Sequence, residues 1–255
     1  MRALFLCLPA MFVASVNAQN TSLTFQSSGK QPALIELYTS EGCSSCPPAE
    51  TWLSRLKESP GLWKDFVPLA FHVDYWDYLG WRDPWASKSF SDRQRAYAKQ
   101  WRSNSIYTPG FVLNGKEWRD WSGRKDGPKS AGVKAGVLTV SASDTNRWQV
   151  SFAPANTDGA DYEVHAALLA GGLSSDVKAG ENRGRRLNHD FVVTAFVTNS
   201  LTTERENLSG HFVLDFKHPK SNIQHPTRLA LAVWVTRVGS LEPLQAVGGW
   251  LPSTP

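Results

Sequence analysis

Two cysteines separated by two residues are the feature of this chain that could do chemistry most directly. Cys43 and Cys46 enclose a Ser-Ser dipeptide, and the only other cysteine is Cys7. A structural zinc site would need a second Cys pair or a close His pair, and the sequence contains neither. A disulfide that closes a four-residue loop stabilises a fold by only about 2 kcal/mol, against about 4.7 kcal/mol for a hundred-residue loop. We therefore expect the pair to carry out thiol–disulfide redox chemistry.

The residues around the pair predict a junction between a strand and a helix. Residues 33–39 form a mostly apolar run that is typical of a buried strand, and a turn-like segment follows at 40–42. The two prolines after the pair suit the first turn of a helix, and apolar residues then recur at helical spacing. The positive end of a helix stabilises a thiolate, so we expect Cys43 to attack and Cys46 to resolve.

Further elements in the first half are predicted to alternate between strands and helices. Residues 66–74 are a strand candidate, and the segment 91–94 is similar to a capping box that opens a helix. Residues 108–117 predict a strand and a tight Asn-Gly hairpin. Seven of the eleven tryptophans fall between positions 52 and 118. They predict either an aromatic core or an exposed groove for a partner.

Five motifs extend from the first predicted strand into the second half of the chain. They are Glu36-Leu-Tyr-Thr-Ser-Glu-Gly-Cys43-Ser-Ser-Cys46-Pro-Pro-Ala, His72-Val-Asp-Tyr-Trp-Asp77, Trp81-Arg-Asp-Pro84, Tyr107-Thr-Pro109 and Gly180-Glu-Asn-Arg-Gly-Arg-Arg-Leu-Asn-His189. In the order of its elements the first half resembles thioredoxins. The set of motifs resembles the exported thioredoxin-like family catalogued as domain of unknown function 1223. The family carries no assigned reaction, so the resemblance implies a fold more than a function.

The resemblance to thioredoxins implies further residues of the site. Thr108-Pro109 matches the proline that in thioredoxins forms a cis bond beside the disulfide and shapes the substrate groove. Thioredoxins also carry an acidic residue beneath the disulfide, and Glu36 takes that place with a one-residue shift. Trp76 and Asp74 complete the set expected to line the groove or tune the cysteines. The Ser-Ser dipeptide differs from the Gly-Pro of ordinary thioredoxins and leaves the direction of electron flow open.

The second half changes to short alternating strands separated by turn-rich segments. The predicted strands are 137–140, 148–152, 162–168, 191–196, 212–216 and 229–235. The expected fold class is an α/β thioredoxin-like domain, residues 19–130, followed by an all-β, sandwich-like C-terminal region, residues 131–255.

The connection between the strands at 162–168 and 191–196 is about twenty residues long, and connections of that length often carry function. It contains four residues that could contact a ligand: Arg183, Arg185, Arg186 and His189. One interpretation is a solvated loop with surface ion pairs. The alternative is that the loop folds over the cysteine pair and supplies an anion or peptide contact.

The first eighteen residues predict a secretory signal peptide. A basic start at Arg2 and an apolar run end at a small-x-small cleavage site, so the mature chain is expected to begin at Gln19, in the periplasm or outside the cell. No later apolar stretch is long enough to predict a membrane span. The formal net charge is +4 without a basic stripe, so nucleic-acid binding is not expected.

The leading hypothesis is therefore a thiol–disulfide oxidoreductase that acts on protein thiols or disulfides, or on a redox partner protein. It would need no cofactor beyond the Cys43–Cys46 disulfide. A copper-binding module without turnover is the alternative, with Cys43, Cys46 and His72 as ligands, because thiolates and imidazole suit Cu(I). A third hypothesis is a binding protein in which the disulfide is only structural.

Overall fold

The structure is a computed structural model. It describes residues 23–143, 146–156, 159–204, 207–214 and 226–252. The predicted signal peptide, residues 1–18, and the expected mature terminus at Gln19 lie outside these residues. Across the described ranges, every helix is too short or too polar to cross a membrane, which agrees with the expectation of no membrane span.

Within the described residues the chain forms two α-helices, two short 3-10 helices and fourteen strands. The helices are α1 (Pro47–Arg55), η1 (Leu56–Glu58), η2 (Asp77–Leu79) and α2 (Lys88–Gln100). The strands of the first half are β1 (Thr24–Gln26), β2 (Ala33–Thr39), β3 (Phe66–His72), β4 (Gly110–Leu113) and β5 (Lys116–Glu117). Those of the second half are β6 (Gly136–Ala142), β7 (Arg147–Pro154), β8 (Tyr162–Gly171), β9 (Leu173–Asp176), β10 (Arg186–His189), β11 (Val192–Glu204), β12 (Asn207–Val213), β13 (Arg228–Arg237) and β14 (Pro243–Trp250).

The expected fold class, an α/β thioredoxin-like domain followed by an all-β sandwich-like region, is wrong. The described residues are mostly β, with 45% in strands and 13% in helices. Twelve strands form one mixed sheet in the order β1-β6-β7-β12-β11-β3-β2-β4-β5, and β8, β13 and β14 extend it from β11. The expectation failed because it treated the first strands as a closed unit. Only two α-helices form in the described part of the chain, and the sheet continues from β3 directly into the second half.

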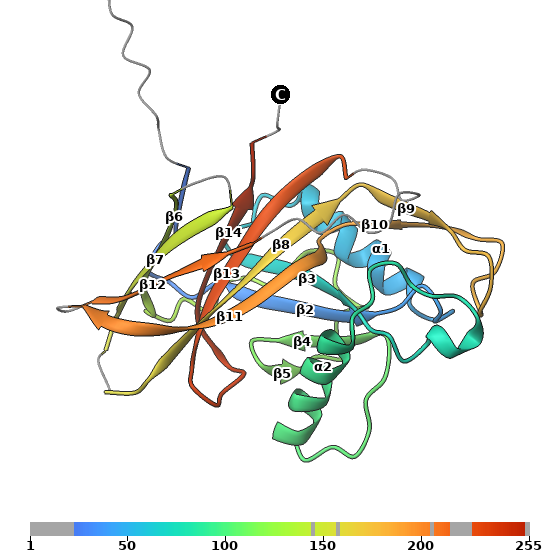
Figure 1. The fold of residues 1–255 in the computed structure, drawn as a ribbon, viewed down its shortest axis with the longest axis horizontal. Helices are drawn as coiled ribbons and strands as arrows, with labels where there is room; N and C mark the ends of the chain where they lie inside the picture. The colour runs from blue at the N-terminus through green and yellow to red at the C-terminus, as the bar shows by residue number, and fades with distance from the viewer. Residues whose placement is uncertain (1–22, 144–145, 157–158, 205–206, 215–225, 253–255) are drawn as a thin grey trace, which may run out of the picture.

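Strand β11 joins the two halves of the sheet (Figure 1). Its first residue, Val192, pairs in parallel with Ala70 of β3, and the strand pairs with β8 along most of its length. Its last residues, Thr202–Glu204, pair with β12. Strand β1 pairs in turn with β6. Strands on both sides of the predicted boundary at residue 130 therefore share one sheet, and the boundary itself stays a prediction.

Several individual elements are confirmed. The predicted strand 33–39 is β2, and α1 begins with the two prolines that follow the cysteines. Helix α2 begins earlier than the segment 91–94 suggested, because Ser87 caps it by accepting a hydrogen bond from the backbone of Ser89. The connection after β8 contains the β9–β10 hairpin. Strand β14 was not predicted, because Pro243 and two adjacent glycines interrupt its apolar pattern.

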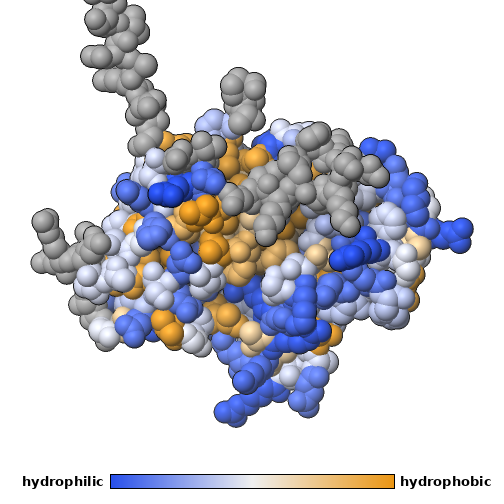
Figure 2. All heavy atoms as spheres, in the orientation of Figure 1, coloured by the Kyte–Doolittle hydropathy of each residue, from blue (hydrophilic) through white to orange (hydrophobic). Residues whose placement is uncertain are grey.

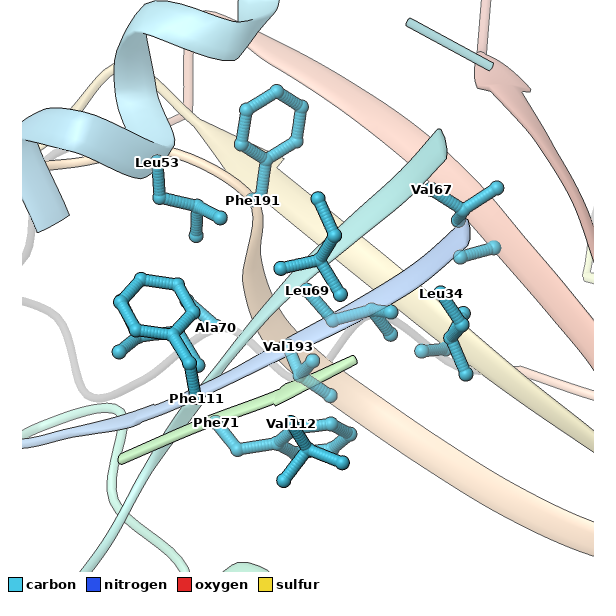
Figure 3. Close-up of a cluster of buried hydrophobic side chains, with 14 of the residues drawn as sticks. Leu34, Leu53, Val67, Leu69, Ala70, Phe71, Phe111, Val112, Phe191 and Val193 are labelled. Atoms are coloured by element: carbon cyan, nitrogen blue, oxygen red, sulfur yellow. The ribbon is translucent and has the colours of Figure 1, made fainter. Parts of the chain in front are cut away.

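Apolar side chains from β2, β3, β4, β11 and α1 form one buried cluster. Figure 3 shows Leu53 of α1 and Phe191 on one side of the strands, and Phe71 and Val112 toward the other. A second cluster gathers residues from β6, β7 and β12 with residues from β8, β13 and β14, among them Phe152, Val164, Phe212 and Val233. Because distant strands of one sheet share this cluster, the sheet curls over its own core.

The alternation of side chains along β2 sends its polar groups to two different places. Glu36 and Tyr38 point toward α2, where Glu36 accepts hydrogen bonds from Arg93, Tyr97 and Tyr38. Thr39 points toward α1 and bonds to Glu50. Figure 1 shows α1 and α2 on opposite sides of this strand. The exposed surface of α2 is hydrophilic (Figure 2).

A buried ion pair anchors α2 to the sheet. The Arg93 guanidinium binds both carboxylate oxygens of Glu36, at 2.8 and 2.9 Å, and Glu36 is 1% exposed. The guanidinium also lies over the rings of Phe71 and Trp234. Such bidentate pairs are strong, and losing one partner leaves a buried charge without compensation.

We predict that Glu36→Gln lowers the free energy of unfolding by about 3 to 5 kcal/mol, because Arg93 would keep its buried charge without a carboxylate. Urea unfolding monitored by tryptophan fluorescence measures this. Asp92→Asn is the control, since Asp92 pairs with Lys88 on the exposed face of the same helix, and only a small change is expected. Equal effects of the two substitutions would contradict the anchoring role of Glu36.

Candidate functional site

The two cysteines lie where β2 passes into α1, as their spacing predicted. Cys43 ends the turn after β2, with its backbone N–H donating to the carbonyl of Ser40, and Cys46 is the residue at the N-cap of α1. Both are free thiols and both are buried, at 1% and 0% exposure. Ser44 and Ser45, the dipeptide between them, are exposed. The pair therefore lies just beneath a surface turn.

Hydrogen-bonding groups from two distant segments meet at the Cys43 sulfur. The Ser45 hydroxyl lies 3.2 Å from Sγ, and the Thr108 carbonyl lies 3.7 Å away. The Thr108 hydroxyl oxygen accepts a hydrogen bond of 2.8 Å from Trp76 Nε1. Because that oxygen accepts from Trp76, its own proton is available to a thiolate on Cys43. The Thr108–Pro109 bond is cis, as the resemblance to thioredoxins implied.

The surroundings give the two thiols different acidities. Hydrogen bonding from Cys46, opposed by burial and aided by Ser45 and Thr108, lowers the pKa of Cys43 to about 6. Burial, together with the hydrogen bond and the charge of Cys43, raises the pKa of Cys46. The direction agrees with the expectation that Cys43 is the more acidic thiol. The physical cause is hydrogen bonding to the Cys43 sulfur, whereas the sequence suggested the helix end.

The predicted loop after β8 also holds the cysteine turn. The Glu181 carboxylate accepts hydrogen bonds from the backbone N–H and the hydroxyl of Ser44, at 2.9 and 2.7 Å. The buried Asn182 amide donates to the backbone carbonyls of Glu41 and Cys43, at 2.9 and 2.8 Å. Glu181 and Asn182 therefore fix the shape of the turn that presents Cys43.

The three arginines of this loop are exposed. Arg185 donates to Asn182 Oδ1 at 2.8 Å, so it supports the cysteine turn through that amide. Arg186 bonds to Ser174 and lies near Asp176, within the β9–β10 hairpin. Arg183 is exposed at the tip of the loop. The loop thus packs against the cysteine turn as one hypothesis predicted, but its arginines face outward.

The fourth predicted residue of the loop, His189, is buried beneath the pair. Its Nδ1 binds a carboxylate oxygen of Glu50, and its Nε2 lies 3.0 Å from Glu41 Oε1. The other oxygen of Glu50 accepts a 2.5 Å hydrogen bond from Thr39. Glu41 Oε2 accepts a further bond from Trp81 Nε1. This imidazole therefore connects β10 with both the cysteine turn and α1.

A second buried histidine, His72, adjoins this network. Its Nδ1 lies 2.8 Å from Asp83 Oδ2, and Asp83 also accepts the backbone N–H groups of Glu41 and Trp85. The rings of His72 and His189 meet edge to face, with centroids 5.2 Å apart. Five ionisable side chains are thus buried together on the α1 side of the sheet.

The acidities in this network follow from its charges. Burial disfavours charge on His189, but the neighbouring charges of Glu50 and Glu41 outweigh it and raise the pKa of His189 well above its ordinary value. Burial also opposes ionisation of Glu50, and His189 outweighs it and lowers the pKa of Glu50. His72 has a raised pKa because Asp83 outweighs its burial. The network is therefore held together by charge as well as by hydrogen bonds.

The residues predicted as tuning groups divide between the site and other regions. Trp76 and Thr108 lie at Cys43, and a side chain at Gly42 would meet Trp76 Cβ at 2.9 Å. Glu36 lies on the other face of β2, bound to Arg93. Asp74 bonds to the hydroxyl of Ser91 on α2. The proposed tuning role of Glu36 therefore has no support in the geometry.

Local sequence reasoning missed several residues of the site, among them Thr39, Glu41, Glu50 and Asn182. One of them carried a usable signal, because Glu50 follows Cys46 by four positions on a predicted helix and so lies on the same helix face. Thr39 and Glu41 needed the register of β2, and Asn182 needed the packing of a distant loop.

The fold and the site define a mostly β protein with a buried, asymmetric cysteine pair at a strand-to-helix junction. The chain belongs to the family described as protein of unknown function, DUF1223, whose sequence profile matches residues 34–236. This match does not show the exported, thioredoxin-like character that the resemblance attached to the family.

Two solved structures share the fold. One is an Agrobacterium tumefaciens protein from a structural genomics consortium, with TM-score 0.58 and 20% identity over 87% of this chain and 94% of that one. The other is HBP35 of Porphyromonas gingivalis, with TM-score 0.56 and 13% identity over 88% of this chain and 76% of that one. At such identities the likeness concerns the fold alone. A comparison with curated proteins found no match.

We predict that alkylation of the reduced protein modifies Cys43 with a midpoint near pH 6, while Cys46 stays unreactive at neutral pH. The thiolate is the reactive form, so the rate rises as the pH passes upward through the pKa of Cys43. Thr108→Val keeps the side-chain volume and removes a donor, and it should move the midpoint upward. Mass spectrometry of iodoacetamide-treated protein measures both. Equal reactivity of the two thiols would contradict the asymmetry.

Proposed function

We propose that the protein carries out thiol–disulfide exchange, with Cys43 as the attacking thiol and Cys46 as the resolving thiol. The observation that carries the proposal is the contrast between the two sulfurs. Ser45 and Thr108 surround Cys43 with hydrogen-bonding groups that favour its thiolate, whereas Cys46 lies deeper, with Thr39 and Glu50 next to it. Cys43 can therefore attack as a thiolate, whereas Cys46 stays protonated until the mixed disulfide has formed.

The reaction follows from this arrangement. The Cys43 thiolate attacks a substrate disulfide, forms a mixed disulfide and releases the first substrate sulfur as a thiolate. Cys46 then gives up its proton, attacks the Cys43 sulfur and releases the second substrate sulfur. The substrate disulfide gains two electrons and the proton from Cys46, and the cysteine pair is oxidised to a disulfide. A second thiol–disulfide partner must restore the pair, and the same steps run in reverse when the protein oxidises dithiols.

The surroundings of Cys43 favour protein thiols or disulfides, or a redox partner protein, as the reacting species. Its sulfur is nearly covered, but exposed residues Ser44 and Ser45 and half-buried residues Thr108 and Pro109 border it. A substrate sulfur approaches between these two backbone segments and displaces part of the cover. Such exchange suits the periplasmic or secreted location that residues 1–18 suggest, because disulfides persist there.

Copper binding by Cys43, Cys46 and His72 has less support. Within the described residues, one group of three potential ligands has its ligand atoms within 4.8 Å of one another, and it contains neither cysteine. The Nδ1 of His72 is engaged by Asp83, and its ring packs edge to face against His189.

We predict that Cys46→Ala protein traps a mixed disulfide through Cys43, because the resolving thiol is missing. Incubation with a disulfide-bonded substrate protein, followed by non-reducing electrophoresis and mass spectrometry, measures the adduct. Cys43→Ala is the matched control and should form none. A redox titration of the wild-type chain should show a two-electron couple. The proposal is wrong if Cys46→Ala protein forms no adduct while Cys43 remains open to alkylation.

A further inference from the structure

Three buried side chains beneath the cysteines meet in a geometry that suits a metal ion. Glu50 of α1, His72 of β3 and His189 of β10 each place one potential ligand atom within 4.8 Å of the others. All three residues are buried, with exposures of 6%, 0% and 1%. They come from three different elements, so a shared ligand would tie α1, β3 and β10 together.

The strongest support for a metal site is the Nε2 nitrogen of His72. Its Nδ1 is engaged by Asp83, whereas Nε2 is fully buried and has no hydrogen-bond partner among the described residues. Buried polar atoms without partners are rare, because each costs the free energy of the lost interaction with water. In its neutral form His72 donates through Nδ1 and presents a lone pair at Nε2, where a metal ion would take the place of a proton. This lone pair is what a metal ion needs.

The groups behind the three ligands are those that metal-binding sites require. A ligating histidine usually donates its other ring N–H to a carboxylate, which fixes the ring and strengthens the ligand. Asp83 does this for His72, and Glu41 does it for His189 at 3.0 Å. The Glu50 carboxylate is oriented in turn by Thr39. Each potential ligand thus has its own outer partner.

The charge of the cluster also favours a cation. Three carboxylates, from Glu41, Glu50 and Asp83, are buried with only two imidazoles. Buried charges are stable only when paired or bound to metal. A divalent ion between His189 and Glu50 would replace the proton that these two groups share, and His189 would bind as a neutral imidazole.

We propose that Glu50, His72 and His189 bind one divalent transition-metal ion of the zinc type, at a site separate from the cysteine pair. Two imidazoles and one carboxylate are a known ligand set for Zn²⁺, with a fourth position left for another ligand. Hard ions such as Mg²⁺ and Ca²⁺ prefer oxygen ligands and are not expected. The ion would join three elements of the fold beneath the redox pair.

The test measures the metal directly. Purified full-length protein is stripped with a chelator and titrated with Zn²⁺ by calorimetry, and metal content is measured by mass spectrometry. Wild-type protein should bind one ion per chain, and the ion should raise its melting temperature. The double variant Cys43→Ser with Cys46→Ser should bind equally well. His72→Gln should weaken binding by more than about 100-fold, beyond the effect of losing an outer partner.

His165→Gln is the matched control, because His165 is also a buried histidine but has both ring nitrogens paired, with Thr198 and Thr236. It should keep the ion. Co²⁺ as a second probe needs no variant, and its absorption spectrum should show nitrogen and oxygen ligation without thiolate charge transfer. Absence of Zn²⁺ binding by wild-type protein, or a Co²⁺ thiolate band that disappears in the double cysteine variant, would overturn the proposal.

Discussion

The buried imidazole of His189 is the group on which the arrangement of the site depends. Both of its ring nitrogens are hydrogen-bonded at once, Nδ1 with Glu50 of α1 and Nε2 with Glu41 of the cysteine turn. A carboxylate buried without such a partner would cost several kcal/mol, so the loop that carries His189 is held against the turn by electrostatics. Asn182 in the same loop then satisfies the carbonyls of Glu41 and Cys43.

Successive side chains of β2 point to opposite faces of the sheet, so the strand separates two groups of buried polar residues. The side chain of Glu36 meets Arg93 on the α2 side, and that of Thr39 meets Glu50 on the α1 side. Because the strand is buried on both faces, neither system reaches the other through solvent. The pair of Glu36 and Arg93 anchors α2, and the group that contains Thr39 and Glu50 lies next to the thiols. A change in one can therefore be measured without the other.

The part of the site that could be predicted is the part encoded by nearby residues. The cysteine spacing and the two prolines of α1 followed from motifs a few residues long, and the cis bond of Thr108–Pro109, with Thr108 at Cys43, followed from the resemblance to thioredoxins. The partners of His189 could not be predicted, because 139 and 148 residues separate it from Glu50 and Glu41. The fold class failed for the same reason: nothing local indicates that β11 pairs with β3.

The distance in sequence between Glu50 and His189 affects how the site forms during synthesis of the chain. The polypeptide is made from its N-terminus, so the cysteines and their two carboxylates exist long before the histidine that pairs with them. Until β10 is complete, the turn lacks Asn182, and Glu41 and Glu50 lack their imidazole. A nascent chain therefore carries its thiols without the hydrogen bonds that shape the finished turn. Synthesis must reach residue 189, about three-quarters of the way along the chain, before the environment of a motif in the first fifth is complete.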